Sequence, residues 1–213
     1  MKINELENII IEGENLNIEF KRKVSSPEKI AKEMIAFANT KGGIIFFGID
    51  DDKTIVGVNS EKEELELIST SANFFCDPPV KFEQKIIYYK HKDIILISVP
   101  ESRKKPHYLF AENKNNRKAF IRQNDESLIA SKVMINIMKS SNLDSHPVTI
   151  NFGETEKTLL KYLSENKTID VKILRKIANI SERRASRTLV NLVRANVILH
   201  NNLNDKEYFT LAN

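Results

Sequence analysis

The chain has 213 residues, of which 41% are hydrophobic and 29% charged, which supports a real core in one large domain or in one medium and one small domain. Its formal net charge of +4 is so mild that only the local distribution of charge argues for a polyanionic partner. The single cysteine, Cys76, excludes a disulfide framework and any zinc site built on several cysteines; its apolar neighbours predict a buried thiol. No apolar run is long enough to cross a membrane, and the N-terminal residues lack the pattern of a signal peptide, so we expect a cytoplasmic protein with no membrane partner.

The first two thirds of the chain predict an α+β domain with a mixed, mostly antiparallel sheet and flanking helices. Alternation over 17–24 indicates a strand with one buried face, which Ile18 and Phe20 would occupy. Ser26 and Pro27 are typical of a helix start, and the glycines of the segment 39–43 can take the positive φ that ends this helix. Further helices are predicted over 61–75 and 127–138. Further strands are predicted over 44–49 (covered on both faces), 54–58, 80–89, 94–99, 108–110 and 119–122, the last two as a hairpin.

The pattern changes after a stretch rich in Ser, Asn and Asp, where periodicity lapses. Beyond it, helices are predicted over 154–165, 170–178 and 182–195, followed by a small hairpin of 197–199 and 208–211. Three helices and a hairpin in this order are the layout of a winged helix-turn-helix. The expected organisation is therefore a first domain over 1–139, a linker over 140–153 and a winged helix-turn-helix domain over 154–213.

The second helix of a helix-turn-helix motif places its N-terminal part in the major groove of DNA. Between Asp170 and Leu199 there are seven Lys or Arg and two Asp or Glu, a local surplus of +5. The side chains predicted to contact bases or phosphates are Ser181, Arg183, Arg184, Ser186 and Arg187. The alternative is a solvated basic helix in a packing or dimerisation module, and winged helices also bind RNA and proteins.

Several separated motifs resemble, in their order, the Alba-type domain of the Schlafen family. They are Glu14-Asn-Leu-Asn-Ile-Glu-Phe-Lys21, Ala36-Phe-Ala-Asn-Thr-Lys-Gly-Gly43, Phe47-Gly-Ile-Asp-Asp51, Asp77-Pro-Pro79, Val99-Pro-Glu-Ser-Arg-Lys-Lys-Pro-His-Tyr108 and Phe120-Ile-Arg122. The resemblance covers residues 10 to 138. It implies a nucleic-acid-binding domain, which in bacteria and archaea is often followed by a helix-turn-helix.

In vertebrate Schlafen proteins the related core is an RNA endonuclease that acts on tRNA-like substrates. By position, Glu14, Glu19 and Asp51 match its acidic residues, and Asp50 is the neighbouring candidate. Two departures stand out. The Schlafen core carries a zinc site that a chain with one cysteine lacks, and it pairs two lobes where this chain has one, so a comparable groove would need a dimer.

Three carboxylates suit a hard cation such as Mg²⁺ or Mn²⁺, which would polarise a phosphate and lower the pKa of an attacking water. Glu14 lies five residues before Glu19, the opposite face of a regular strand, so a turn near Asn15 must bring both to one ion. The alternatives are a tight turn at the three aspartates and a surface ion pair of Glu19 with Lys21 or Arg22. The predicted contacts to the phosphate backbone are Lys21, Arg22, Lys23, Arg103, Lys104, Lys105 and Arg122.

These patterns predict a nucleic-acid-binding protein, in the first place a DNA-binding transcriptional regulator that acts as a homodimer. The alternative is a metal-dependent, Schlafen-like endoribonuclease acting on tRNA or other structured RNA, with Mg or Mn as cofactor; a protein-interaction adaptor is a third hypothesis. His107 would be a general acid, a phosphate contact or a plain loop histidine. No G-x4-G-K-[ST] motif occurs, so P-loop chemistry is not predicted and no cofactor is required outside the nuclease hypothesis.

Overall fold

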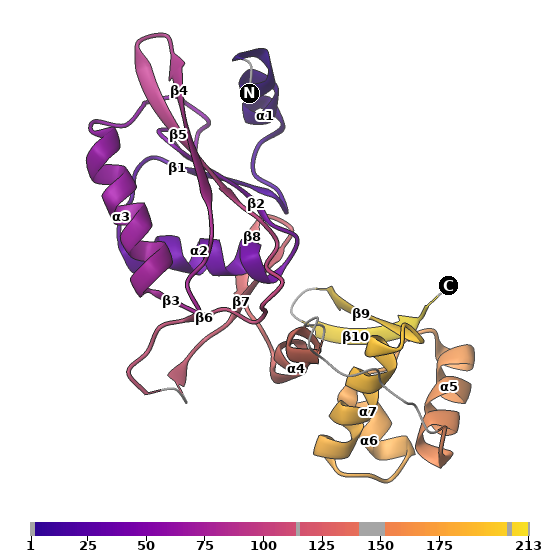
Figure 1. Cartoon of the computed structure of the whole chain (residues 1–213). Coiled ribbons are helices and arrows are strands. Elements are labelled where there is room, and N and C mark those ends of the chain that lie inside the picture. The colour runs from indigo at the N-terminus through magenta and orange to yellow at the C-terminus, as the bar shows by residue number, and fades with distance from the viewer. Residues whose placement is uncertain (1–2, 114–115, 141–151, 204–205, 213) are drawn as a thin grey trace. The chain divides into compact units, whose positions relative to one another are not determined.

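The computed structural model describes residues 3–113, 116–140, 152–203 and 206–212. Within the chain, residues 1–131 and 132–213 form two compact units, which we call the first unit and the second unit (Figure 1). None of the helices in these described ranges is long and apolar enough to cross a membrane.

The first unit is built on a four-stranded sheet with the order β1-β2-β5-β4. Its strands are β1 (Ile18–Lys21), β2 (Gly43–Phe47), β4 (Glu83–Tyr89) and β5 (Lys92–Val99). Strands β1 and β2 are parallel and are joined by α2 (Pro27–Asn39), whereas the other neighbours are antiparallel. The predicted class, a mixed and mostly antiparallel sheet with flanking helices, is confirmed.

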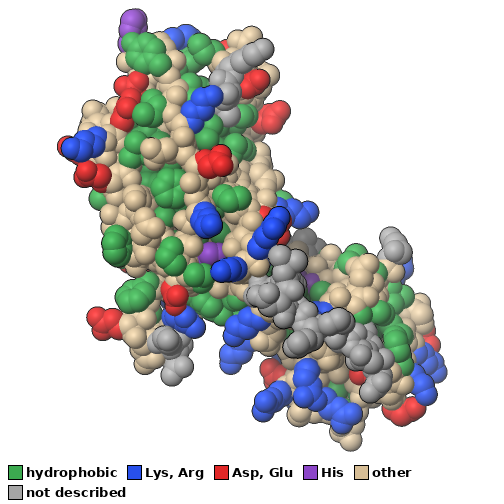
Figure 2. All heavy atoms as spheres, viewed as in Figure 1, with side chains coloured by type: hydrophobic (Ala, Val, Ile, Leu, Met, Phe, Trp, Pro, Cys, Tyr) green, Lys and Arg blue, Asp and Glu red, His purple; other side chains and the backbone are tan. Residues whose placement is uncertain are grey.

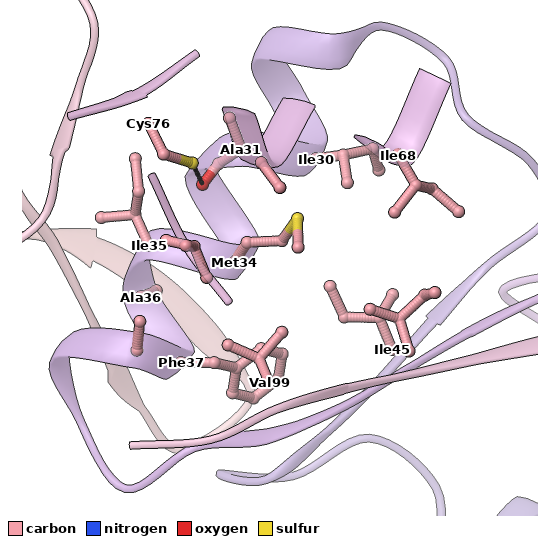
Figure 3. Packing of buried hydrophobic residues seen from close by; sticks show 14 of the residues in the cluster. Ile30, Ala31, Met34, Ile35, Ala36, Phe37, Ile45, Ile68, Cys76 and Val99 are labelled. Carbon is pink, nitrogen blue, oxygen red and sulfur yellow. Dashed lines mark hydrogen bonds between the residues drawn. The ribbon is translucent and has the colours of Figure 1, made fainter. Parts of the chain in front are cut away.

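Both faces of the sheet are covered, as the continuous apolar run of β2 predicts. Ile45 and Phe47 pack with α2 and α3 (Glu61–Phe74) on one face. In Figure 3, Phe37 of α2 lies beside Val99 of β5, and Cys76 reaches the Ala31 carbonyl. On the other face Phe46 packs in a cluster with Leu6, which belongs to α1 (Ile3–Glu12). Helix α1 was not predicted from the sequence.

Local signals determine where α2 begins and ends. The Ser26 hydroxyl accepts a hydrogen bond from the Lys29 N–H at 3.3 Å, and Pro27 occupies the first turn. At the other end, Gly42 has φ +74° and donates its N–H to the Phe37 carbonyl at 2.9 Å. The predicted helix start and the predicted glycine stop are both confirmed.

The small strands of the first unit differ from the prediction. They are β3 (Cys76–Asp77), β6 (Tyr108–Leu109), β7 (Phe120–Gln123) and β8 (Glu126–Ile129). The hairpin predicted over 108–110 and 119–122 forms only as an isolated antiparallel bridge between Leu109 and Lys118, because β6 pairs with β3 and β7 pairs with β8. The helix predicted over 127–138 is wrong in its first part, where β8 forms; α4 (Lys132–Ser140) begins later. The strand predicted over 54–58 is only a bridge between Ile49 and Ile55.

The second unit contains α4 and three further helices followed by a two-stranded antiparallel sheet. Leu159, Leu174, Leu189 and Phe209 lie in its buried core, together with Val133 of α4. Residues 141–151, which form most of the predicted linker, lie outside the described residues. The helices and strands are α5 (Glu154–Asn166), α6 (Val171–Ile177), α7 (Glu182–Arg194), β9 (Ile198–Leu203) and β10 (Lys206–Leu211).

Candidate functional site

The turn that the metal hypothesis requires is present before β1. Asn15 and Ile18 exchange backbone hydrogen bonds at 3.1 and 3.4 Å, and the Asn15 side chain accepts from the Asn17 N–H at 2.9 Å. This turn folds Glu14 back along the strand, where its Oε1 accepts a hydrogen bond from the Phe20 N–H at 2.8 Å. Glu14 and Glu19 therefore lie close enough to interact, although they are five residues apart.

The carboxyl group of Glu14 has a raised pKa. Partial burial of this group is the largest cause, although the residue as a whole is exposed, and the nearby Glu19 carboxylate acts in the same direction. The Phe20 N–H, Lys21 and Arg122 oppose both effects by stabilising the charged form. Glu14 is thus a carboxylate held by one backbone donor beside a second carboxylate.

Glu19 is buried, with only 6% of the residue exposed, so β1 does not have the single buried face that its alternation predicts. Its Oε2 accepts a hydrogen bond from Arg122 Nη1 at 2.8 Å, and its Oε1 pairs with the Lys21 ammonium. Each oxygen of this carboxylate already faces a cation. The ion pair with Lys21 forms as the alternative interpretation proposed, but the acidic partner lies inside the protein rather than on its surface.

Arg122 lies at the centre of a buried polar network, with its side chain 1% exposed. Its Nη1 donates to Glu33 Oε2 at 3.3 Å and to Ser127 Oγ at 3.2 Å, and its Nη2 donates to the Asn15 carbonyl at 2.8 Å. The guanidinium also lies 4.7 Å from the centre of the Phe37 ring. The expected surface cation is therefore an internal one, because two carboxylates and a carbonyl surround it.

Glu33 and Ser127 are members of this network that sequence reasoning missed. The Ser127 hydroxyl donates to Glu33 Oε2 and accepts from Arg122, which joins α2 to β8. No clear signal pointed to Glu33, because it follows Lys32 on a helix that also carries Glu28 and Lys29. Its side chain is only 12% exposed, and its partner Arg122 comes from a distant strand.

The other charged residues near β1 and after β2, from Arg22 and Lys23 to Asp50 and Asp51, lie at the surface. Arg22 Nη1 contacts Asp50 Oδ2 at 2.6 Å, while Lys23 is exposed. Asp51 is exposed and sits in a turn in which the Lys53 N–H bonds to the Asp50 carbonyl at 2.8 Å. The predicted tight turn at the aspartates is therefore confirmed.

A metal centre of three side chains is not found in the described part of the chain, where no group of three His, Cys, Asp or Glu is arranged to hold an ion. Glu14 and Glu19 come together, whereas Asp51 belongs to the exposed turn with Asp50. The set Glu14, Glu19 and Asp51 thus stays a prediction as a metal or catalytic site.

The basic loop after β5 lies over a cavity of about 430 Å³. Arg103 and Lys104 are exposed and line the cavity. Lys105 is oriented elsewhere, because its ammonium contacts the Thr40 carbonyl at 2.8 Å and Glu101 Oε1 at 2.6 Å. Two of the three predicted loop cations are thus available at the surface, and the third fastens the loop to the end of α2.

His107 is 4% exposed and forms part of the cavity lining. Its Nδ1 lies 2.7 Å from the Pro78 carbonyl and its Nε2 lies 2.7 Å from the Ser102 hydroxyl. The Asn39 side chain holds the His107 backbone: its Oδ1 accepts a hydrogen bond from the His107 N–H at 2.7 Å, and its Nδ2 donates to the His107 carbonyl at 2.9 Å. Burial lowers the pKa of His107, with partial opposition from the Pro78 carbonyl, so the neutral imidazole is favoured.

In the second unit, α6 and α7 are joined by a short turn in which the Ile180 N–H bonds to the Arg175 carbonyl at 3.1 Å. Ser181 caps α7 by accepting a hydrogen bond from the Arg184 N–H at 3.3 Å. Arg183, Arg184 and Arg187 are exposed on the first two turns of α7, and Ser186 is half-buried. Figure 2 shows Lys and Arg side chains gathered at the lower edge of the second unit.

Comparisons with known proteins give relatives that match parts of the chain. A protein of Ureaplasma parvum, described as an uncharacterized ATP-binding protein, is 34% identical over 87 residues, which cover 38% of this chain and 24% of the relative. The match therefore spans about a quarter of that relative's length.

Two solved structures match parts of the chain. A crystal structure of a Corynebacterium diphtheriae protein has a TM-score of 0.50 at 15% identity, covering 84% of this chain and 39% of that one. An NMR structure from Nitrosomonas europaea, of the N-terminal domain of a protein described as related to the ATP-dependent DNA helicase RecG, has a TM-score of 0.42 at 17% identity. It covers 71% of this chain and 92% of that one.

A family model described as Schlafen, AlbA_2 matches residues 14–131, which is more than half of the chain. The matched region runs from Glu14, which precedes β1, to Ser131, which lies between β8 and α4. It contains the whole Arg122 network, the aspartate turn and the loop with His107. The chain belongs to the Schlafen AlbA_2 family.

Proposed function

We propose that this protein binds nucleic acid and that its second unit is a winged helix-turn-helix that contacts DNA through α7. The observation that carries the proposal is the division of α7 into two faces. Arg183, Arg184 and Arg187 are exposed, whereas Ala185 and Leu189 are buried against the core. Guanidinium groups at the start of a helix, next to its positive dipole end, suit phosphate oxygens and guanine edges.

The order of elements supports this proposal. Helix α6 would be the first helix of the motif and α7 the recognition helix, with β9 and β10 as the wing. Helix α6 adds the exposed cations Lys172, Arg175 and Lys176 to the same part of the chain. We infer that the protein is a transcriptional regulator and that it reads paired half-sites as a homodimer, since helix-turn-helix proteins commonly do so.

Family membership and the name of the Ureaplasma relative support two ligand classes, nucleic acid and ATP. We favour nucleic acid as the principal function because the exposed arginines of α7 suit a polyanion. ATP would need a phosphate site other than a P-loop, since the sequence contains no G-x4-G-K-[ST] motif.

The test begins with selection of a duplex from a random pool by the wild-type chain, followed by gel-shift titration of that duplex. The variant R183A/R184A/R187A is expected to lose specific binding. The control K29A/K62A/K161A removes three exposed lysines from other helices, and the same formal charge, and should bind almost as the wild type does. Circular dichroism checks that both variants fold. Unchanged binding by the α7 variant would refute the assignment of α7.

The nuclease alternative has less support, because both oxygens of Glu19 face cations. Incubation of the protein with tRNA and Mn²⁺ tests this alternative directly. Asp51→Asn suits this test better than a substitution of Glu19, since Asp51 is exposed and its loss leaves the buried network intact. Cleavage by the wild type and not by Asp51→Asn would establish the nuclease, and no cleavage by either leaves the binding function.

A further inference from the structure

The cavity beneath the basic loop is a feature of the first unit that DNA binding by α7 does not use. It lies between the C-terminal half of α2, the segment 78–81 and the loop 100–107. Its volume of about 430 Å³ falls within the range of small-molecule sites, roughly 300–1,000 Å³. Five apolar side chains contribute to its walls: Ala38, Pro78, Pro79, Val80 and Pro100.

The buried polar groups of the cavity lining are joined by hydrogen bonds. The Pro78 carbonyl only accepts hydrogen bonds, so Nδ1 of the neutral His107 imidazole carries the proton and donates to it. Nε2 then accepts from the Ser102 hydroxyl, and that oxygen accepts in turn from the Lys104 N–H at 3.1 Å. The Ser102 N–H bonds to the Ala38 carbonyl at 2.9 Å, which fixes the loop on α2.

The rim of the cavity is positively charged. Lys81, Arg103 and Lys104 line it and are exposed, while Glu101 is the acidic residue of the lining. Three cations and one carboxylate leave a local charge of 3 − 1 = +2, with His107 neutral. Glu101 already pairs with Lys105 at 2.6 Å, so its charge is offset from outside the cavity. Apolar walls under a cationic rim suit a ligand with an apolar or planar body and an anionic end.

We propose that this cavity binds a nucleoside phosphate as a free mononucleotide, with its phosphate at Arg103 and Lys104 and its base against the proline walls. Arg103 provides a planar fork for phosphate oxygens, and Lys104 adds a point charge. The base would be buried against Pro78, Pro79 and Pro100, which stabilises it by removing apolar surface from water. A nucleotide within a single strand presents the same chemistry, so the experiment must separate these two sources.

The test is calorimetric titration of the full chain with AMP, ATP, adenosine, inorganic phosphate and a single-stranded oligonucleotide. We expect AMP or ATP to bind at least about tenfold more tightly than adenosine, which lacks the phosphate, or than inorganic phosphate, which lacks the base. R103A/K104A is expected to weaken nucleotide binding by about tenfold or more. The matched control K62A/K85A removes two exposed lysines that do not line the cavity and should bind as the wild type does.

Pro100→Glu provides a second variant, because it replaces an exposed apolar residue of the wall, on which the base would pack, by a carboxylate, and it should weaken the binding of AMP and ATP. Absence of nucleotide binding, or equal binding by the wild type and R103A/K104A, overturns the proposal. Tighter binding of the oligonucleotide, lost in R103A/K104A, would also overturn it and assign the cavity to a strand. Failure of the α7 proposal is distinguishable, since R183A/R184A/R187A should retain nucleotide binding.

Discussion

Arg122 Nη1 lies 2.8 Å from Glu19 Oε2, so two residues 103 positions apart in the chain form a buried ion pair. The pair ties β1 to β7, and Glu33 extends it to α2. Arg122 also bonds to the Asn15 carbonyl in the turn that follows Glu14, so the network holds Glu14 and Glu19 in place. Its members are therefore structural in the first instance, and their loss should be measurable as a loss of stability.

Arg122→Ala is expected to lower the free energy of unfolding by about 3–5 kcal/mol, since it leaves Glu19 and Glu33 buried without their common cation. Urea unfolding at neutral pH measures this change. The double variant R122M/E19Q should lose less than the sum of the two single variants, because it leaves no unpaired charge at position 19.

Arg22→Ala is the control for this prediction. Arg22 also pairs with an aspartate, Asp50, at 2.6 Å, but its side chain is 63% exposed. Surface pairs of this kind contribute about 0–1 kcal/mol, so the control should unfold almost as the wild type does. Equal losses for Arg22→Ala and Arg122→Ala would show that burial does not strengthen the internal pair.

His107 predicts a pH dependence of stability. Burial places its pKa in the folded protein below the value of about 6.5 that an exposed histidine has. The unfolded chain therefore takes up the proton first as the pH falls. The stability contributed by the neutral imidazole is complete above about pH 6.5 and is lost below it. Unfolding titrations at pH 8 and pH 5.5 should show that the advantage of the wild type over His107→Asn shrinks at the lower pH.

His91→Asn serves as the matched variant, because His91 is exposed and has a positive φ that asparagine tolerates. The free energies of unfolding of His91→Asn at pH 8 and pH 5.5 provide the comparison, since this variant also removes one imidazole. A constant difference between the wild type and His107→Asn would contradict the buried neutral imidazole.

Cys76 is expected to be unreactive until the protein unfolds. Burial raises the pKa of its thiol from 9.0 to about 12, with partial opposition from the Val80 N–H. At pH 8 the reactive thiolate is then lower by roughly a thousandfold than in an exposed thiol, and the 4% exposure of the residue adds steric protection. Titration with an aromatic disulfide reagent should label the native protein only very slowly.

The same reagent in concentrated urea provides the comparison, because Cys76 is the only cysteine of the chain and every labelling event reports on it. Fast labelling in urea with slow labelling in buffer is the expected pair of results. Labelling at similar rates in both conditions would mean that the α2 and α3 packing around Cys76 opens easily.

Some features with local causes were predicted from the sequence and others were missed, whereas features with distant partners were not predicted. Helix α2 was predicted from end to end because Ser26 and Gly42 act within a few residues of themselves. Helix α1 was missed although Gly13, with φ +86° and its N–H donated to the Ile9 carbonyl at 2.9 Å, ends it as Gly42 ends α2. Its stabilisation by burial of Leu6 against strands far along the chain has no local signal. The pairing of β7 with β8 was missed although it is local: Arg122 and Ser127 are cross-strand partners five residues apart, and Asn124 takes a positive φ of 54° in the turn between the strands.

The candidate sites follow the same division. The turn at Asn15 was a stated condition of the metal hypothesis and is present, since asparagine readily bonds to the backbone two residues on. The burial of Arg122 was not predictable, because the seven cations predicted to contact phosphate give no indication of which one has carboxylate partners 89 and 103 positions away. Lys105 was also expected to face solvent, and it instead bonds to the Thr40 carbonyl.

Salt dependence distinguishes what the α7 arginines contact. If Arg183, Arg184 and Arg187 all neutralise phosphates, the slope of log K against log salt should become shallower by roughly 2–3 in R183A/R184A/R187A, at about 0.9 per phosphate. If they read bases instead, affinity and sequence discrimination should fall while the slope stays nearly constant. Binding of a selected and a scrambled duplex between about 50 and 200 mM salt measures both quantities.

The control K29A/K62A/K161A separates contact from overall charge, because it changes the formal net charge by the same amount. Its slope should match that of the wild type, since released counterions come from neutralised phosphates and not from distant charges. A slope that changes equally in both variants would mean that α7 contributes only to the general field of the protein. An exposed arginine on the first turns of a capped helix is placed for direct contact, so we expect the two slopes to differ.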